Sequence, residues 1–195
     1  MKLVFASSNL NKLNEIRSLT SDGYTIVGLP DLNFTEELEE TGATLEENAL
    51  QKARFIARKY GLNCFSDDSG LEVNALKGAP GVHSAYYAGL PRDDAKNMNL
   101  LLNNLHGASN RKAVFRTVIA MVWEGKEYLF EGRLEGTICD SPRGTAGFGY
   151  DPVFIPDGHM KTLAEGGMEL KNSISHRKRA VAALINFLET HKMNR

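Results

Sequence analysis

The sequence predicts an α/β fold with a mixed sheet and helices on its faces. Short apolar runs typical of strands alternate along the chain with segments whose apolar residues recur at helical intervals. Residues 113–123 and 128–137 interrupt this alternation, because their β-branched and aromatic content indicates two long consecutive strands. No linker, internal repeat or low-complexity run divides the 195 residues, so we expect one domain, 1–195.

The chain begins with a strand, a polar loop and a helix. Residues 3–6 are a continuous apolar run, and Leu13 and Ile16 give residues 12–19 a helical spacing. A second short strand over residues 24–29 is stopped by Pro30. An acidic connection without clear periodicity follows.

The next helix has a clear start signal. Thr44 and Glu47 are spaced as a capping box, which satisfies orphan N–H groups at a helix N-terminus. The buried stripe of this helix consists of Leu45, Ala49, Ala53 and Ile56. Beyond the helix, we expect short strands over residues 63–66 and 71–73, which flank a turn with the sequence DDSG.

A glycine-punctuated loop over residues 78–89 leads to another helix, which Asp93 or Asp94 caps and which runs to about Leu105. The two long strands then follow, joined by a turn at residues 124–126.

The end of the chain is read as a short strand over residues 153–155 and a closing helix from about Ser175 to Thr190. The buried face of that helix consists of Val181, Leu184, Ile185 and Leu188.

Charge and cysteine content restrict the possible functions. The 23 basic and 24 acidic residues give a net charge of −1, so no global positive field gathers nucleic acid, and phosphate binding must be local. Cys64 and Cys139 are too few for a disulfide framework and lack the spacing of a zinc site. No run approaches the roughly 18 apolar residues of a membrane span. We therefore expect a cytoplasmic protein with buried thiols.

Two polar segments could bind phosphate or metal. Ser7, Asn9 and Lys12 lie where a strand meets a helix N-terminus, which favours an anion, although Asn9 or Ser8 could equally cap the helix. Asp67 and Asp68 could hold Mg²⁺ together with Glu39 or Glu40, although aspartates are also ordinary turn residues. These candidate ligands are oxygens, as Mg²⁺ requires.

Two further segments could bind a base. Phe148 and Tyr150 flank Gly149, so in an extended segment they would share a face on which a base could stack, although they could also be core aromatics. Gly147 and Gly149 do not belong to a dinucleotide-binding loop, because the pattern GxGxxG would require a glycine where the chain has Pro152. Near the C-terminus, the sequence HRKR follows Ser175 at the start of a predicted helix. The helix dipole disfavours basic residues at a helix N-terminus. This misfit favours a functional role for these residues over a merely solvated first turn.

Taken together, the sequence resembles the inosine triphosphate pyrophosphatase family, from Lys2 to about Leu188. The resemblance rests on SSNLNK (7–12), EETGATLEENALQKAR (39–54), SDDSG (66–70), TAGFGYDPVF (145–154) and SISHRKR (173–179). It implies hydrolysis of dITP, ITP and XTP to the monophosphate and pyrophosphate, through metal-assisted attack of water on the α-phosphorus. It also implies Mg²⁺ as cofactor and a long central sheet splayed into two lobes with a cleft between them, and members of the family are commonly homodimers. From charge and apolar content, we expect neither stable nucleic-acid binding nor a membrane partner.

The same resemblance assigns residues to roles. Asp68 corresponds to the catalytic base, and Glu40, Asp67 and Asp68 correspond to the metal site. An aspartate with an unperturbed pKa near 3.9 is a poor base, so we expect it mainly to orient the water. Substrate and phosphate contacts are implied for Ser7, Ser8, Asn9, Lys12, Lys52 and Ser69, and base contacts for Phe148, Gly149, Tyr150, Asp151, Lys171, Ser175, His176 and Arg177.

The family resemblance also suggests how the base is selected. An Arg177 donor aimed at C6 would accept the carbonyl of inosine and reject the amino group of adenine, while a donor near C2, from His176 or a backbone N–H, would exclude guanine. Two positions depart from the family pattern. Ser8 replaces a glycine, and Tyr86 stands where a basic residue is common, for which Arg92 could compensate.

Two other functions fit some of these motifs. One is a pyrophosphatase for modified pyrimidine or other triphosphates. The second is a nucleotide-binding or RNA-binding module without hydrolysis, although such a binder has little need for Glu40, Asp67 and Asp68 near phosphate.

Overall fold

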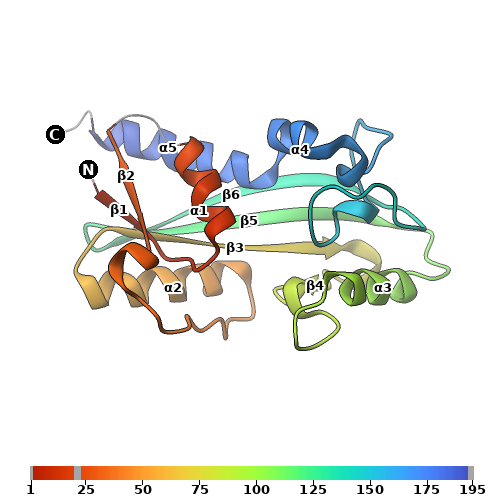
Figure 1. Cartoon of the computed structure of the whole chain (residues 1–195), viewed down its shortest axis with the longest axis horizontal. Coiled ribbons are helices and arrows are strands. Elements are labelled where there is room, and N and C mark those ends of the chain that lie inside the picture. The colour runs from red at the N-terminus through yellow and green to blue at the C-terminus, as the bar shows by residue number, and fades with distance from the viewer. Residues whose placement is uncertain (1, 20–22, 193–195) are drawn as a thin grey trace. The chain divides into compact units, whose positions relative to one another are not determined.

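A computed structural model describes residues 2–19 and 23–192 of the chain, which form a mixed sheet with helices (Figure 1). Its strands are β1 (Lys2–Phe5), β2 (Thr25–Gly28), β3 (Cys64–Val73), β4 (Pro80–Gly81), β5 (Lys112–Trp123), β6 (Lys126–Ile138) and β7 (Phe154–Pro156). Its α-helices are α1 (Leu10–Leu19), α2 (Leu45–Tyr60), α3 (Asp94–Asn104), α4 (Leu163–Ile174) and α5 (His176–Lys192). Short 3₁₀ helices span Pro30–Leu32, Asn74–Leu76, Ser84–Tyr86 and Asp151–Val153.

The sheet contains both parallel and antiparallel pairs, as predicted. Its strand order is β2-β1-β3-β5-β6-β7, and β4 pairs with β3 off this path. β1 is parallel to both β2 and β3, whereas β4 is antiparallel to β3 and β7 is antiparallel to β6. The mixed α/β fold is therefore confirmed.

The chain divides into two compact units. Unit 1 comprises residues 1–68, 117–131 and 178–195, and unit 2 comprises residues 69–116 and 132–177. β3, β5 and β6 each contribute residues to both units. The expected single domain and the expected cleft stay predictions.

Unit 1 has apolar cores on both faces of its strands. α1 and α5 cover one face and α2 covers the other (Figure 1). The first core contains Leu13 and Ile16 of α1 and Val181, Leu184 and Leu188 of α5, and these side chains pack with Phe5 and Phe65, whose rings stack at 5.0 Å. On the other face, Ile56 of α2 packs with Val4, Ala6 and Cys64.

Unit 2 has its own core, with α3 and α4 on opposite sides of its strands (Figure 1). Leu101 and Leu105 pack with Val73 of β3, Leu134 of β6 and Phe154 of β7. A ring contact of 4.6 Å between Phe115 and Phe154 joins β5 to β7. Each unit thus buries its own apolar surface, which is the main stabilising term for such packing.

Most predicted element boundaries are close to the observed ones. α2 begins after Thr44, whose hydroxyl accepts the Glu47 N–H, and α3 begins after Asp93, whose carboxylate accepts the Lys96 N–H. The predicted capping box is only half formed, because the Glu47 carboxylate accepts the N–H of Ala43 rather than that of Thr44. Within the predicted loop 78–89 the structure has β4 and a 3₁₀ helix.

Two predictions about secondary structure were wrong. The turn expected at DDSG is absent, since β3 runs without interruption from Cys64 to Val73. The sequence analysis also missed α4, which begins with a complete capping box formed by Thr162 and Glu165. Gly166 and Gly167 hide this helix, because glycine is unfavourable in helix interiors, and Gly167 indeed has a non-helical φ of 68°. Among the described residues, no helix has the length and apolarity needed to cross a membrane.

Candidate active site

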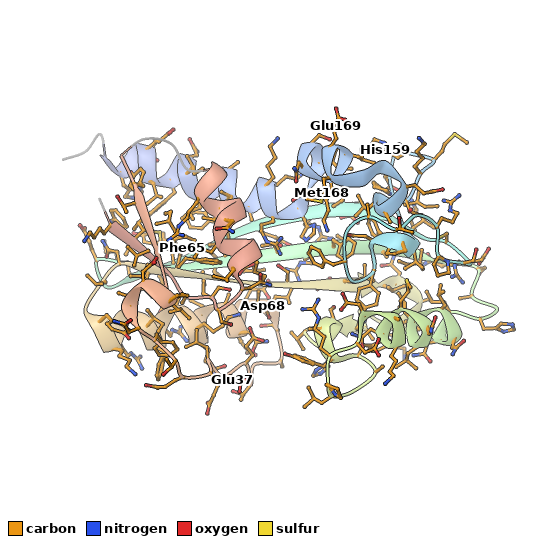
Figure 2. All side chains as sticks on the ribbon, viewed as in Figure 1. Glu37, Phe65, Asp68, His159, Met168 and Glu169 are labelled. Atoms are coloured by element: carbon orange, nitrogen blue, oxygen red, sulfur yellow. The ribbon has the colours of Figure 1, made fainter. Side chains whose placement is uncertain are left out.

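β3 places two consecutive aspartates in the interior of unit 1. Asp67 is 0% exposed and Asp68 is 8% exposed, and Figure 2 shows Asp68 on β3. Strand residues alternate between the two faces of a sheet, so the two carboxylates meet different partners. The side chains of α1 and α2 supply those partners, which explains why a strand can hold residues that usually favour turns.

Lys12 of α1 pairs with Asp67. Its Nζ lies 3.1 Å from Oδ1 and 3.0 Å from Oδ2 of that carboxylate. Asn9 places the helix, because its Oδ1 accepts the N–H of Lys12 while its own N–H donates to Ser7 Oγ. Asn9 therefore caps α1, as one of the two interpretations expected, and the Lys12 ammonium is held at Asp67. Phosphate binding by this segment stays a prediction. Ser8 is exposed.

Lys52 of α2 joins the acidic loop to β3. Its Nζ donates to the backbone oxygen of Asp67 at 2.8 Å and forms an ion pair with the Glu40 carboxylate. Lys52 is only 7% exposed, so it is not the surface lysine that its helical position alone would suggest. Glu39, the other acidic candidate of the loop, is exposed, and Ser69 of β3 is half-buried.

The pKa of the Asp68 carboxyl is raised above its ordinary value. Burial is the main cause, and the Glu40 charge adds to it, whereas Lys52, a hydrogen bond from Asn48 and Lys12 act in the opposite direction. The expected role of orienting the water was based on an ordinary aspartate pKa, and that role stays a prediction. A raised pKa makes Asp68 a better proton acceptor than the sequence alone indicates.

These residues fit a divalent cation. Glu40 is close enough to Asp68 for its charge to raise the pKa of the Asp68 carboxyl, and a cation would offset this repulsion. Within residues 2–19 and 23–192 no cluster of three or more His, Cys, Asp or Glu forms a ready-made metal cage. Mg²⁺ does not need one, because it commonly takes one or two carboxylates and completes its shell with water and substrate phosphates.

Unit 2 holds the residues predicted to contact the base. Asp151 Oδ2 accepts the Phe148 N–H at 2.9 Å and the Lys171 Nζ at 2.5 Å, and the Lys171 Nζ lies 3.8 Å from the centre of the Phe148 ring. Phe148 is 54% exposed although it is fixed from behind in this way. A Cβ at Gly147 would lie 2.1 Å from Asp151 Oδ2, so only glycine allows this loop. The arrangement presents an aromatic ring against which a planar base can stack.

Tyr150 does not share a face with Phe148, as the extended segment would have required. Gly149 has a φ of 61°, and the chain turns there. Tyr150 points into the core of unit 2, is 4% exposed and donates its hydroxyl to the Ser84 backbone oxygen at 2.8 Å. Burial raises the pKa of this phenol. Phe148 is therefore the exposed ring of the pair.

The residues Ser175, His176 and Arg177, which are predicted to contact the base, lie where α4 ends and α5 begins. Ser175, His176 and Arg177 are 3%, 8% and 6% exposed, whereas Lys178 and Arg179 are exposed. The His176 ring stacks on Phe115 with centroids 5.1 Å apart and planes 9° apart. Two of the four residues in the first turn of α5, His176 and Arg177, are therefore buried, so this basic turn is not wholly exposed to solvent.

Two residues that support these groups were missed. Asp94 of α3 accepts the Gly149 N–H at 2.8 Å and pairs with Arg92, and together these bonds lower its pKa although burial opposes them. Through Asp94, Arg92 thus supports the loop that carries Phe148. Tyr86, which departs from the family pattern, is exposed. Asn48 of α2, 2% exposed, contacts Asp68. A polar residue beside the apolar stripe of α2 was the only sequence signal for it.

The chain belongs to the Ham1 family, whose model matches residues 3–187. A dITP/XTP pyrophosphatase of Porphyromonas gingivalis is 53% identical over 188 residues, which cover 96% of this chain and 97% of the relative.

Solved structures agree with this membership. The Ham1 protein of Staphylococcus aureus superposes with a TM-score of 0.92 at 40% identity, covering 98% of this chain and 100% of the other. The nucleoside-triphosphatase / dITP/XTP pyrophosphatase of Mycobacterium abscessus has a TM-score of 0.83 at 46% identity, covering 95% and 99%.

Proposed function

We propose that this chain hydrolyses the non-standard purine nucleotides dITP, ITP and XTP to the nucleoside monophosphate and pyrophosphate, and so removes them from the nucleotide pool. The observation that carries the proposal is the buried Asp68 with Glu40, Lys12 and Lys52 around it in unit 1. A binding module without hydrolysis has no use for a buried carboxylate that is costly to ionise. The names of the relatives support dITP and XTP as substrates.

Asp68 acts on the attacking water. Its carboxylate accepts one proton as the water oxygen bonds to the α-phosphorus, the bond from that phosphorus to its bridging oxygen breaks, and pyrophosphate leaves. Lys12 and Lys52 supply positive charge for the phosphate oxygens on which negative charge develops. No covalent intermediate with the protein is required.

Phe148 provides stacking, which contributes about 1–3 kcal/mol per base and hardly distinguishes one base from another. Selection therefore depends on the base edges. The Arg177 side chain carries only hydrogen-bond donors. It can therefore donate to a carbonyl oxygen at C6, whereas an amino group at C6 would face it with a second donor and is disfavoured. A second donor facing C2, from His176 or a backbone N–H, disfavours the amino group of guanine.

We further propose Mg²⁺ as the cofactor. Glu40 and Asp68 would hold it, with Asp67 beside them, and when bound it would polarise the phosphate oxygens as a Lewis acid. Without it, three carboxylates and two ammonium groups leave this cluster one negative charge in excess, which repels a triphosphate.

The setting of the enzyme is also a proposal. Cys64 and Cys139 are both free thiols, which suits a reducing cytoplasm. The family resemblance suggests a homodimer, which light scattering of the purified chain would test.

Pyrophosphate release across a panel of triphosphates tests the proposed activity. We expect dITP, ITP and XTP to be cleaved with a higher kcat/KM than dATP, dGTP or pyrimidine triphosphates, and we expect excess chelator to abolish turnover. A higher kcat/KM for a pyrimidine triphosphate would instead favour the related pyrimidine enzymes. Binding of dITP without any release would favour a binding module.

A further inference from the structure

Asn48 lies in the first turns of α2 and connects two parts of the candidate active site. Its Nδ2 donates to Asp68 Oδ2 at 3.1 Å, and its Oδ1 accepts the N–H of Gly42 at 2.7 Å. The side chain is 2% exposed, so neither bond competes with bulk water. One amide thus touches the carboxylate of Asp68 and the loop that carries Glu40.

α2 holds that loop through a row of side-chain acceptors. The N–H groups of Thr41 and Ala43 donate to Gln51 Oε1 at 3.1 Å and to Glu47 Oε2 at 2.7 Å, on either side of the Gly42 bond. A Cβ at Gly42 would lie 2.5 Å from the Glu47 Cβ and 2.9 Å from Asn48 Oδ1, so glycine permits the close approach. Three consecutive backbone donors are therefore fixed by one helix, but only Asn48 continues to a reacting group.

We propose that Asn48 is a positioning residue, which fixes the Asp68 carboxylate relative to the Glu40 loop so that water and metal ligands are held in one geometry. This role rests on the proposed function. It needs an amide at position 48, because one end must accept from Gly42 and the other must donate to Asp68. A carboxylate can perform only the first task and an alkyl group neither.

The variant Asn48→Asp separates the two bonds. The new carboxylate keeps an acceptor for the Gly42 N–H but presents an oxygen, in place of a donor, to Asp68 Oδ2. We expect kcat for dITP to fall by about 100-fold, the size that misplacement of a catalytic group by roughly 1 Å can cause. We expect the Kd of α,β-imido-dITP, measured by calorimetry with saturating Mg²⁺, to rise by much less than kcat falls, because the added charge weakens phosphate binding while the stacking and the lysine contacts remain.

Gln51→Ala is the matched control on the same helix and the same loop. It removes the acceptor for Thr41 but touches no part of Asp68. We expect its kcat to stay within about threefold of the parent. Asn97→Asp controls for a buried aspartate as such, because Asn97 is also 2% exposed and its side chain bonds to the backbone of Ala85 and Ala88, away from Asp68. It should lower the unfolding midpoint at least as much as Asn48→Asp.

Hydrogen exchange gives a readout that does not depend on activity. The Gly42 amide should stay protected in Asn48→Asp and lose protection in Asn48→Ala, whereas Gln51→Ala should expose the Thr41 amide alone. If Asn48→Asp turns over dITP within threefold of the parent, or if Gly42 stays protected in Asn48→Ala, the positioning role is wrong. A parent enzyme that releases no pyrophosphate would instead overturn the proposed function, and the exchange results would still test the link between Asn48 and the loop.

Discussion

Replacing Asp68 by asparagine should lower kcat for pyrophosphate release from dITP by about 10²- to 10⁴-fold, which is the usual contribution of a general base. Asparagine has nearly the same shape and can still accept the hydrogen bond from Asn48, but it cannot take a proton. Binding of α,β-imido-dITP should therefore be largely kept. Single-turnover kinetics measures the expected loss of rate, and calorimetry measures the expected retention of α,β-imido-dITP binding. Near-normal turnover would remove Asp68 from the proposed chemistry.

The same variant should not be less stable when metal is absent. The pKa of Asp68 is raised in the folded protein, so the fold favours the protonated carboxyl. The contribution of the Asp68 carboxyl to the free energy of unfolding is complete at pH values below its pKa in the unfolded chain. It is lost as the pH rises through its pKa in the folded protein. At neutral pH the ionised carboxylate therefore costs stability, which Asp68→Asn removes. Thermal unfolding in chelator should give the variant an equal or higher midpoint at pH 7.5 and a smaller advantage at pH 4.

Asp157→Asn is the control for loss of a carboxylate elsewhere. Asp157 forms an exposed ion pair with Lys112, and such pairs contribute about 0–1 kcal/mol. Its turnover should match the parent. A marked loss of stability in Asp68→Asn would mean that this carboxylate is a structural group, which contradicts its proposed role.

Replacing Arg177 by alanine should reduce the ratio of kcat/KM for dITP over dATP by about 5- to 150-fold. This range corresponds to the roughly 1–3 kcal/mol that a buried hydrogen-bonding group costs when its partner is wrong. Arg177 is 6% exposed, so water cannot readily replace the partner that an adenine amino group fails to provide. Competition between the two nucleotides in one reaction, with both monophosphates quantified, measures the ratio directly.

Arg179→Ala is the matched control, because Arg179 is exposed and lies two residues further along α5. Its ratio should be unchanged. If Arg177→Ala also leaves the ratio unchanged while lowering both rates, Arg177 binds phosphate or supports the fold, and base discrimination depends on other groups.

Much of the fold was predictable because local signals agreed with the tertiary structure. Thr44 and Asp93 cap helices, the apolar stripe of α2 is buried, and the two long strands appear as β5 and β6. The turn between them is two residues, Glu124 and Gly125, both with positive φ, which suits a tight hairpin.

β3 could not be predicted because its aspartates depend on distant partners. Lys12 and Lys52 lie far from Asp67 in sequence, and no propensity scale includes their ammonium groups. The same holds for Tyr150. Its ring packs in the core of unit 2 and its hydroxyl donates to the Ser84 backbone oxygen, and both contacts involve residues distant in sequence. Propensity fails where long-range contacts decide the structure.

The candidate site could be predicted only in part, for a related reason. Motif spacing indicated Lys12, Asp68, Phe148 and Arg177. It gave no indication of Asn48 or Asp94, whose role is to hold other groups rather than to react. Nor could it indicate the raised pKa of Asp68, because burial of the carboxyl is a property of the folded chain.

Hydrolysis of dITP in ¹⁸O-labelled water tests the central claim most directly. Attack of water on the α-phosphorus places one label in the deoxyinosine monophosphate and none in the pyrophosphate, which mass spectrometry of both products will detect. Label in the pyrophosphate, or release of labelled orthophosphate, would show that water attacks another phosphorus and would contradict the mechanism.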